Sequence, residues 1–196
     1  NRKRHADDKR NQLYKEFLRF VEVLKPRAIL LENVSGMKST GDFVPEIEKS
    51  LSEVGGMEVK SKLLYAPDYG VPQSRLRLVF VGVKGKKFDF ESIEKTNGEG
   101  TGKPYNTVWD AIGDLPVLAA NAESSKYTMR PKTEYQILMR GDVPAGKLTN
   151  HQAPNHPQDV IDMIHNTKEG EPMYEKYHQR IRLSRTELSP TQVSGG

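Results

Sequence analysis

Apolar side chains recur at helical spacing near the start of the chain, from residue 11 to residue 24. The apolar positions that share one helical face are Leu13, Phe17, Phe20, Val21 and Leu24, and the charged positions opposite them are Lys15, Glu16, Arg19 and Glu22. This spacing predicts an amphipathic helix that ends before Pro26. Residues 27 to 33 are mostly apolar, which predicts a strand of the parallel type, buried on both faces.

The apolar positions also predict a second helix and two more strands. Asp42 could cap a helix that ends at Gly55-Gly56. Its apolar positions are Val44, Ile47, Leu51 and Val54. Strands are expected over residues 57 to 65 and 75 to 83. The order helix, strand, helix, strand, strand predicts an α/β fold with a partial doubly wound, Rossmann-like sheet, whose last two strands could be antiparallel at one edge.

Beyond residue 84 the apolar pattern weakens. Residues 84 to 103 are rich in Gly, Lys and Glu and are expected to form a connection. A short helix is predicted over residues 107 to 112, and the only other good helical stretch contains Val160, Ile161 and Ile164. The chain after about residue 118 is polar, with scattered Pro and Gly, and is expected to be irregular.

Composition narrows the classes of function only mildly. A net charge of +4 and a pI near 9.1 slightly favour a polyanionic partner. The first ten residues carry five Lys or Arg against two Asp, and this segment is either phosphate-facing or plain solvated surface. No stretch approaches the roughly 20 apolar residues of a membrane span, so no membrane association is expected.

Cysteine and histidine usage limits the chemistry that these residues can perform. The chain has no cysteine, which excludes a disulfide framework, a cysteine nucleophile and a thiolate metal site within it. The histidines fit no tight ligand spacing, so no metal site is expected; they include His151, His156, His165 and His178. No glycine-rich loop of the dinucleotide or P-loop type is present.

Charged residues stand where two of the predicted strands end or begin. Glu32 closes the first strand, and ligands of open α/β sheets bind beyond the carboxyl ends of the strands. This carboxyl could donate a proton, or it could be a capping or surface carboxylate. Arg75 and Arg77 fall on one side of their strand and could bind a substrate anion or form a structural ion pair with Glu32. Gln73 could hydrogen-bond backbone or a base.

Three blocks of sequence follow one another along the chain. They are DKRNQLYKEF at residues 8 to 17, ENVSGM at 32 to 37 and YAPDYGVPQSRLR at 65 to 77. Their order and spacing resemble the DNA cytosine-5 methyltransferases of the prokaryotic type. The ENV triplet alone is weak evidence, but the third block about 35 residues later makes the match specific. The resemblance continues in TVWDAIGDLP at 107 to 116 and, more faintly, at Asn150-His151 and from 182 to 191.

The resemblance implies a methyltransferase that uses S-adenosyl-L-methionine. In this family a cysteine adds to C6 of a flipped-out cytosine, and C5 then takes the methyl group of the cofactor. Glu32 would hold and protonate the N3 side of the cytosine in a partly dry site, and Arg77 would contact the cytosine carbonyl and orient Glu32. The other assignments are Asn33 and Val34 to the base pocket, Gln73 and Arg75 to the flipped base or the DNA backbone, Thr191 to a backbone contact, and Leu13 to the neighbourhood of the cofactor.

The resemblance also implies a central-to-C-terminal fragment, because the cofactor loop, the Pro-Cys motif and the closing motifs are missing. Residues 1–117 would be the C-terminal part of the catalytic domain, and residues 118–196 would be part of the target-recognition region. We expect duplex DNA as the partner, a role in restriction-modification and a cytoplasmic, prokaryotic location. Alone, the fragment is predicted to be inactive without the remainder of the methyltransferase domain, and an exposed sheet edge could let it self-associate.

Two alternatives remain open at this point. The first is an RNA cytosine-5 methyltransferase of the same fold. The second is a non-catalytic module that binds DNA or protein through residues 118 to 196.

Overall fold

The computed structural model describes residues 13–34, 43–144, 146–178 and 180–191. The chain divides into two compact units. The sheet unit comprises Asn1–Tyr65 and Leu76–Lys95, and the loop unit comprises Ala66–Arg75 and Thr96–Gly196. This division by contacts does not follow the functional boundary predicted at residue 117, which stays a prediction.

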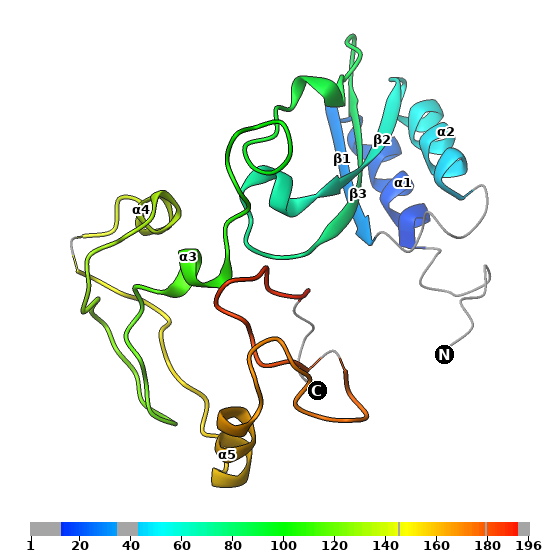
Figure 1. Ribbon diagram of the computed structural model, residues 1–196. Coiled ribbons are helices and arrows are strands. Elements are labelled where there is room, and N and C mark those ends of the chain that lie inside the picture. The colour runs from blue at the N-terminus through cyan, green and yellow to red at the C-terminus, as the bar shows by residue number, and fades with distance from the viewer. Residues whose placement is uncertain (1–12, 35–42, 145, 179, 192–196) are drawn as a thin grey trace. The chain divides into compact units, whose positions relative to one another are not determined.

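The sheet unit contains a three-stranded sheet in the order β1-β3-β2 (Figure 1). The strands are β1 (Ala28–Val34), β2 (Val59–Tyr65) and β3 (Leu76–Val83), close to the predicted bounds. Both outer strands pair antiparallel with β3, so β1 and β2 run in the same direction without touching. The predicted antiparallel pairing of the last two strands is confirmed. A mixed α/β unit with a small open sheet is therefore present.

The prediction that residues 27 to 33 form a parallel strand buried on both faces is wrong for the described residues. β1 pairs antiparallel with β3, and its burial alternates along the strand. Ile29 is buried, whereas the next residue, Leu30, is 69% exposed. The reason is that the core helices pack against the face that carries Ile29, whereas Leu30 lies on the opposite face, which is covered only in part.

Two helices cover the sheet face that carries Ile29, namely α1 (Leu13–Leu24) and α2 (Phe43–Gly55). The buried core they build with the sheet consists of Tyr14, Val21, Ile29, Ile47, Leu51, Met57, Val59, Leu78 and Phe80. Gly82 belongs to the same sheet face, and a Cβ there would stand 2.7 Å from the Val59 side chain. The strand therefore needs glycine where β2 and β3 pack closely.

The buried face of α1 matches the predicted one in part. The predicted Val21 is buried and the predicted Phe17 packs against the core, whereas Leu13, Phe20 and Leu24 are exposed. Tyr14 and Leu18 complete the buried face, which is therefore rotated from the predicted centre. For α2 the predicted Ile47 and Leu51 are buried, and its predicted cap Asp42 lies outside the described residues, as do residues 1 to 12 and 35 to 37.

The loop unit contains η3 (Ala66–Tyr69), α3 (Val108–Ile112), α4 (Glu134–Arg140) and α5 (Gln158–Asn166), whereas η4 (Phe90–Ser92) belongs to the sheet unit. The sequence predicted α3 and α5 but not α4. α3 begins at a capping box in which Thr107 and Asp110 bond each other's backbone N–H. Within the described ranges, no helix is long and apolar enough to cross a membrane.

Candidate functional site

An ion pair joins two of the predicted site residues at one end of the sheet. Arg77 Nε lies 2.5 Å from Glu32 Oε1. Glu32 pairs with Val79 and Val34 pairs with Arg77, so the two charged residues are diagonal neighbours on the same face of adjacent strands. Because β1 and β3 are antiparallel, the C-terminal end of β1 lies beside the N-terminal end of β3. Topology therefore brings together two residues that are far apart in the sequence.

The pair lies on the open face of the sheet and keeps hydrogen-bonding capacity. Half of the Glu32 side chain is exposed, at 51%, against 20% for Arg77. Arg77 Nη1 donates to the Leu76 carbonyl at 2.8 Å. The exposed half of the Glu32 carboxyl leaves it accessible to a ligand on this face. The partly dry site expected for Glu32 is not formed by the described residues alone.

The two residues after Glu32 complete this end of β1. Asn33 Oδ1 accepts the N–H of Val34 at 2.7 Å, and Val34 is exposed on the same face as Glu32. Glu32 lies inside β1, two residues before its end, and does not close the strand as predicted. The Val34 side chain is therefore an apolar surface next to the ion pair.

Gln73 and Arg75 belong to the loop unit, in the connection that leads into β3. Gln73 forms a parallel bridge with Ser189, and the Arg75 carbonyl accepts the N–H of Ala66 at 2.9 Å. Thr191 donates its hydroxyl to the Ser74 carbonyl at 2.8 Å. Within the loop unit, the structure thus brings Gln73 and Thr191 to the same segment. Arg75 lies just before β3, not within it as predicted.

The same connection is braced by residues that the sequence analysis did not single out. Asp68 is nearly buried, and its Oδ1 accepts the Tyr105 hydroxyl at 2.8 Å. Asn106 Nδ2 donates to the carbonyl of Gly70 at 2.7 Å, where the chain turns with a φ of +85°. These contacts link positions 36 or 37 residues apart, so no local pattern could have revealed them.

The described residues fit a metal or a bound cofactor poorly. No group of three or more His, Cys, Asp or Glu gathers in the described part of the chain. Leu13, predicted to lie near the cofactor, is an exposed apolar residue at the start of α1. One apolar side chain cannot orient a cofactor such as S-adenosyl-L-methionine, because such sites need several placed polar groups. What the arrangement can do is hydrogen-bond the edge of a planar ligand through Glu32 and Arg77.

The sequence matches a protein family and several curated proteins. The profile of the C-5 cytosine-specific DNA methylase family matches residues 1–194. The chain is 32% identical over 195 residues to the Type II methyltransferase M.DdeI of Desulfomicrobium norvegicum, covering 95% of this chain and 46% of that protein. It is 34% identical over 189 residues to M.BsuRI of Bacillus subtilis, covering 92% and 42%.

A solved structure has a similar fold. It is a prophage-encoded E. coli protein assigned to the DNA modification methyltransferases, and it matches with a TM-score of 0.69 and 25% identity. The match covers 95% of this chain and 58% of that one. The chain thus spans about half the length of the relatives it matches.

Proposed function

The chain belongs to the C-5 cytosine-specific DNA methylase family, and from this premise we propose that it forms part of an enzyme that methylates C5 of a flipped-out cytosine in duplex DNA. The observation that carries the proposal is the Glu32–Arg77 pair on the open face of the sheet. Its Type II methyltransferase relatives favour a role in restriction-modification, which in a prokaryote takes place where the DNA is, in the cytoplasm.

Glu32 would bind the cytosine and supply a proton. Its exposed carboxyl would face the N3 side of the base, and protonation at N3 would make C6 more susceptible to attack by a nucleophile. Arg77 would donate to the cytosine carbonyl from its guanidinium while its Nε holds the carboxyl in place. Val34 and Asn33 would border the base, and closure of the site over the base would exclude water from the ion pair.

The catalytic cysteine and the binding site of the methyl donor would come from the rest of the methyltransferase domain. S-adenosyl-L-methionine supplies the methyl group, with Leu13 as one neighbouring side chain. We expect this chain alone to be inactive, because it has no cysteine. The remainder would pair with the open edge of β1 and extend the sheet to the doubly wound form. Without it, the same edge and the exposed Leu30 would favour self-association.

The loop unit would contact the DNA. Gln73 and Arg75 would contact the flipped base or its flanking backbone, and Thr191 would support the connection that carries them through its bond to Ser74. Residues 118–196 would form part of the target-recognition region. Phosphate contacts by this mildly basic chain would add affinity that falls with salt.

Methyl transfer from tritiated S-adenosyl-L-methionine tests the proposal directly. The complete reading frame that contains this chain is incubated with plasmid DNA and, separately, with tRNA, and the labelled nucleosides are separated. We expect 5-methylcytosine in DNA only. Label in tRNA alone would replace the proposal with the RNA enzyme. Salt-sensitive DNA binding without transfer to either nucleic acid would replace it with the binding module.

A further inference from the structure

The connection between β2 and β3 is held in place by a separate segment of the chain. We call Ala66–Arg75 the β2–β3 loop and residues 96–106 the brace, and both belong to the loop unit. The loop is closed at its base, because the Ala66 N–H donates to the Arg75 carbonyl at 2.9 Å. Gln73 and Arg75, which are assigned above to the flipped base or its flanking backbone, lie in the second half of this loop.

The brace binds the first half of the loop at Asp68. The Tyr105 hydroxyl donates to Asp68 Oδ1 at 2.8 Å. The Asp68 carbonyl accepts the N–H of Thr96 at 2.8 Å and that of Asn97 at 3.2 Å. Asp68 is only 9% exposed. Because a buried polar group that loses its partners is costly, these bonds favour a single position for this part of the loop.

Asn106 fixes the turn that follows Asp68. Its Nδ2 donates to the Gly70 carbonyl at 2.7 Å. Gly70 has a φ of +85°, and a Cβ there would lie 3.3 Å from Asn97 Oδ1, so the brace packs directly against the turn. The chain leaves this turn toward Gln73. The bond from Asn106 therefore controls the direction in which the second half of the loop begins.

The second half of the loop is held by backbone bonds instead. The Ser74 N–H donates to the Ser189 carbonyl at 2.8 Å, and the Ser189 N–H donates to the Pro72 carbonyl at 3.0 Å. No side chain takes part in these two bonds, so they persist when side chains are changed. The Tyr105 and Asn106 bonds are made by side chains, so single substitutions can remove them.

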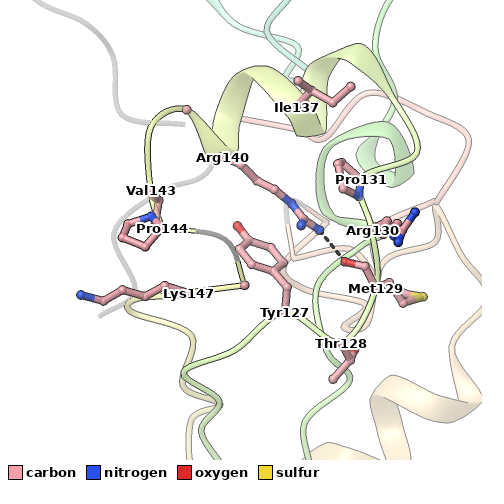
Figure 2. A pocket seen from close by; sticks show the side chains of 12 residues that line it. Tyr127, Thr128, Met129, Arg130, Pro131, Ile137, Arg140, Val143, Pro144 and Lys147 are labelled. Atoms are coloured by element: carbon pink, nitrogen blue, oxygen red, sulfur yellow. Dashed lines mark hydrogen bonds between the residues drawn. The ribbon is translucent and has the colours of Figure 1, made fainter.

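The two brace side chains do not line the cavity of the loop unit that Figure 2 shows. That cavity has a volume of about 520 Å³, and its lining residues lie between Tyr127 and Lys147. Within it Tyr127 and Arg140 face one another, with the guanidinium carbon 3.7 Å from the ring centre. Tyr105 and Asn106 instead direct their polar atoms at the loop, as residues do that support a site from behind.

We infer that Tyr105 and Asn106 are positioning residues of the methyltransferase reaction. They hold the β2–β3 loop in the conformation that brings Gln73 and Arg75 to the flipped base, without touching the base themselves. The inference rests on the proposed function. A displacement of about 1 Å at a reacting centre can lower a rate about a hundredfold, so loss of a brace bond should slow turnover more than it weakens DNA binding.

The test uses the complete methyltransferase and two nearly isosteric variants, Tyr105→Phe and Asn106→Asp. Each variant removes one donor to the loop and keeps the shape of the side chain. The matched control is Thr101→Val, because the Thr101 hydroxyl donates to the Gly98 carbonyl at 2.8 Å, inside the brace. The target site is first found by sequencing 5-methylcytosine in plasmid DNA that the wild type has methylated.

Steady-state kinetics on a duplex with this site measure the effect on the reaction. We expect kcat to fall about tenfold in Tyr105→Phe and Asn106→Asp, with the KM for S-adenosyl-L-methionine and the affinity for the duplex changed less than about twofold. Thr101→Val should keep the wild-type kcat. Melting curves set a temperature at which all four proteins are folded, so that a smaller folded fraction does not lower kcat.

Hydrogen exchange tests the role of the brace without relying on activity. Exchange in a peptide that covers residues 66–75 should be about tenfold faster in both variants, because each has lost one hydrogen bond to the loop. Exchange in β3 should be unchanged. A purely structural role would instead speed exchange in the loop and in β3 alike, with kcat unchanged at the common folded temperature.

The outcomes separate the inference from the function on which it rests. If the wild type methylates duplex DNA and both variants keep the kcat of Thr101→Val, the inference is overturned and the proposed function stands. Faster loop exchange with unchanged kcat also overturns it, because the brace would then order the loop without aiding the reaction. If the wild type transfers no methyl group to duplex DNA, the proposed function fails and the inference fails with it.

Discussion

The two units of the chain are built from different interactions. In the sheet unit the buried residues are apolar and come from alternate strand positions and from one helical stripe. In the loop unit the buried apolar side chains are few, and they include Val108 and Leu148. The buried polar residues of the described chain are Asp68, Asn97, Asp114 and Gln136, and all four belong to the loop unit.

This difference shows how each unit can serve a function. A packed apolar core holds β1 and β3 in fixed register, which keeps Glu32 and Arg77 in contact. The loop unit depends on individual hydrogen bonds and ion pairs, so its surface can vary as long as those pairs are kept. Such a division would suit the proposed roles, in which the sheet unit fixes the Glu32–Arg77 pair and the loop unit contributes surface contacts.

The largest effect on stability is expected from Phe80→Ala in the sheet unit. Phe80 is fully buried in the middle of β3, so the variant loses apolar contacts and leaves a cavity. The free energy of unfolding should fall by about 4 kcal/mol. Leu30→Ala, on the exposed face, should cost less than about 0.5 kcal/mol. Urea denaturation followed by circular dichroism measures both, and a loss below about 1 kcal/mol for Phe80→Ala would contradict the role given to the apolar core.

A slightly smaller effect is expected from Asp114→Ala in the loop unit. The variant leaves the mostly buried Arg140 guanidinium without its carboxylate, at a cost of about 3 kcal/mol. The double variant Asp114→Leu/Arg140→Met removes both charges and should recover most of this loss. Fluorescence of Trp109, the only tryptophan, follows unfolding of this unit. Equal losses in the single and double variants would show that the charge pair is not what the unit depends on.

Gln136→Ala should have an intermediate effect on the same unit. It leaves the Lys132 N–H without its partner and removes one of the two bonds to the Trp109 carbonyl, which keeps the N–H of Gly113, and this costs about 1 to 2 kcal/mol. Ile137→Ala, one position along, should be almost neutral because Ile137 is exposed. The expected order is the reverse of the usual one, because here removing a polar side chain lowers the free energy of unfolding more than removing its apolar neighbour. Chemical denaturation of the pair shows whether α4 is held by polar contacts.

The smallest effect concerns pH. The backbone N–H of Arg185 donates to Glu169 and lowers the pKa of this carboxyl, and the Arg185 guanidinium pairs with it as well. A lowered pKa in the folded state means that the stabilisation is present above the ordinary pKa and is lost as pH falls through the folded value. The urea midpoint of the wild type should therefore fall slightly more between pH 5 and pH 3 than that of Glu169→Gln. A parallel pH dependence of the two proteins would rule out this contribution.

Sequence patterns predicted the sheet unit well because its signals are local. The bounds of β2 and β3 came from apolar runs, and the ends of α1 and α2 came from Pro26 and Gly55-Gly56. The apolar stripe on α1 was predicted only in part, with Phe17 and Val21 right and Leu13, Phe20 and Leu24 wrong, because two neighbouring apolar stripes overlap and only tertiary packing chooses between them. The burial of β1 was misjudged because an apolar run does not tell how many faces are covered.

The loop unit was less predictable for the opposite reason. α4 has its apolar residues in consecutive positions, so no periodicity marked it as a helix. The pairs Tyr105–Asp68 and Arg140–Asp114 join residues that are 37 and 26 positions apart, and no sequence pattern around one partner predicts the other. Glu32 and Arg77 were found because they lie near strand ends and in family motifs, and an ion pair between them was one of the two interpretations offered for the arginines.

The central claim is that Glu32 acts on the cytosine, and methylation of duplex DNA by the complete reading frame tests it most directly. Wild type is compared with Glu32→Ala, and Glu46→Ala, a carboxylate on α2 away from the pair, serves as the control. We predict a loss of methyl transfer in Glu32→Ala on the order of a hundredfold or more, as expected for a positioned acid, measured at a temperature at which melting curves show the variant to be folded. Equal rates for wild type and Glu32→Ala would show that the Glu32–Arg77 pair is only structural.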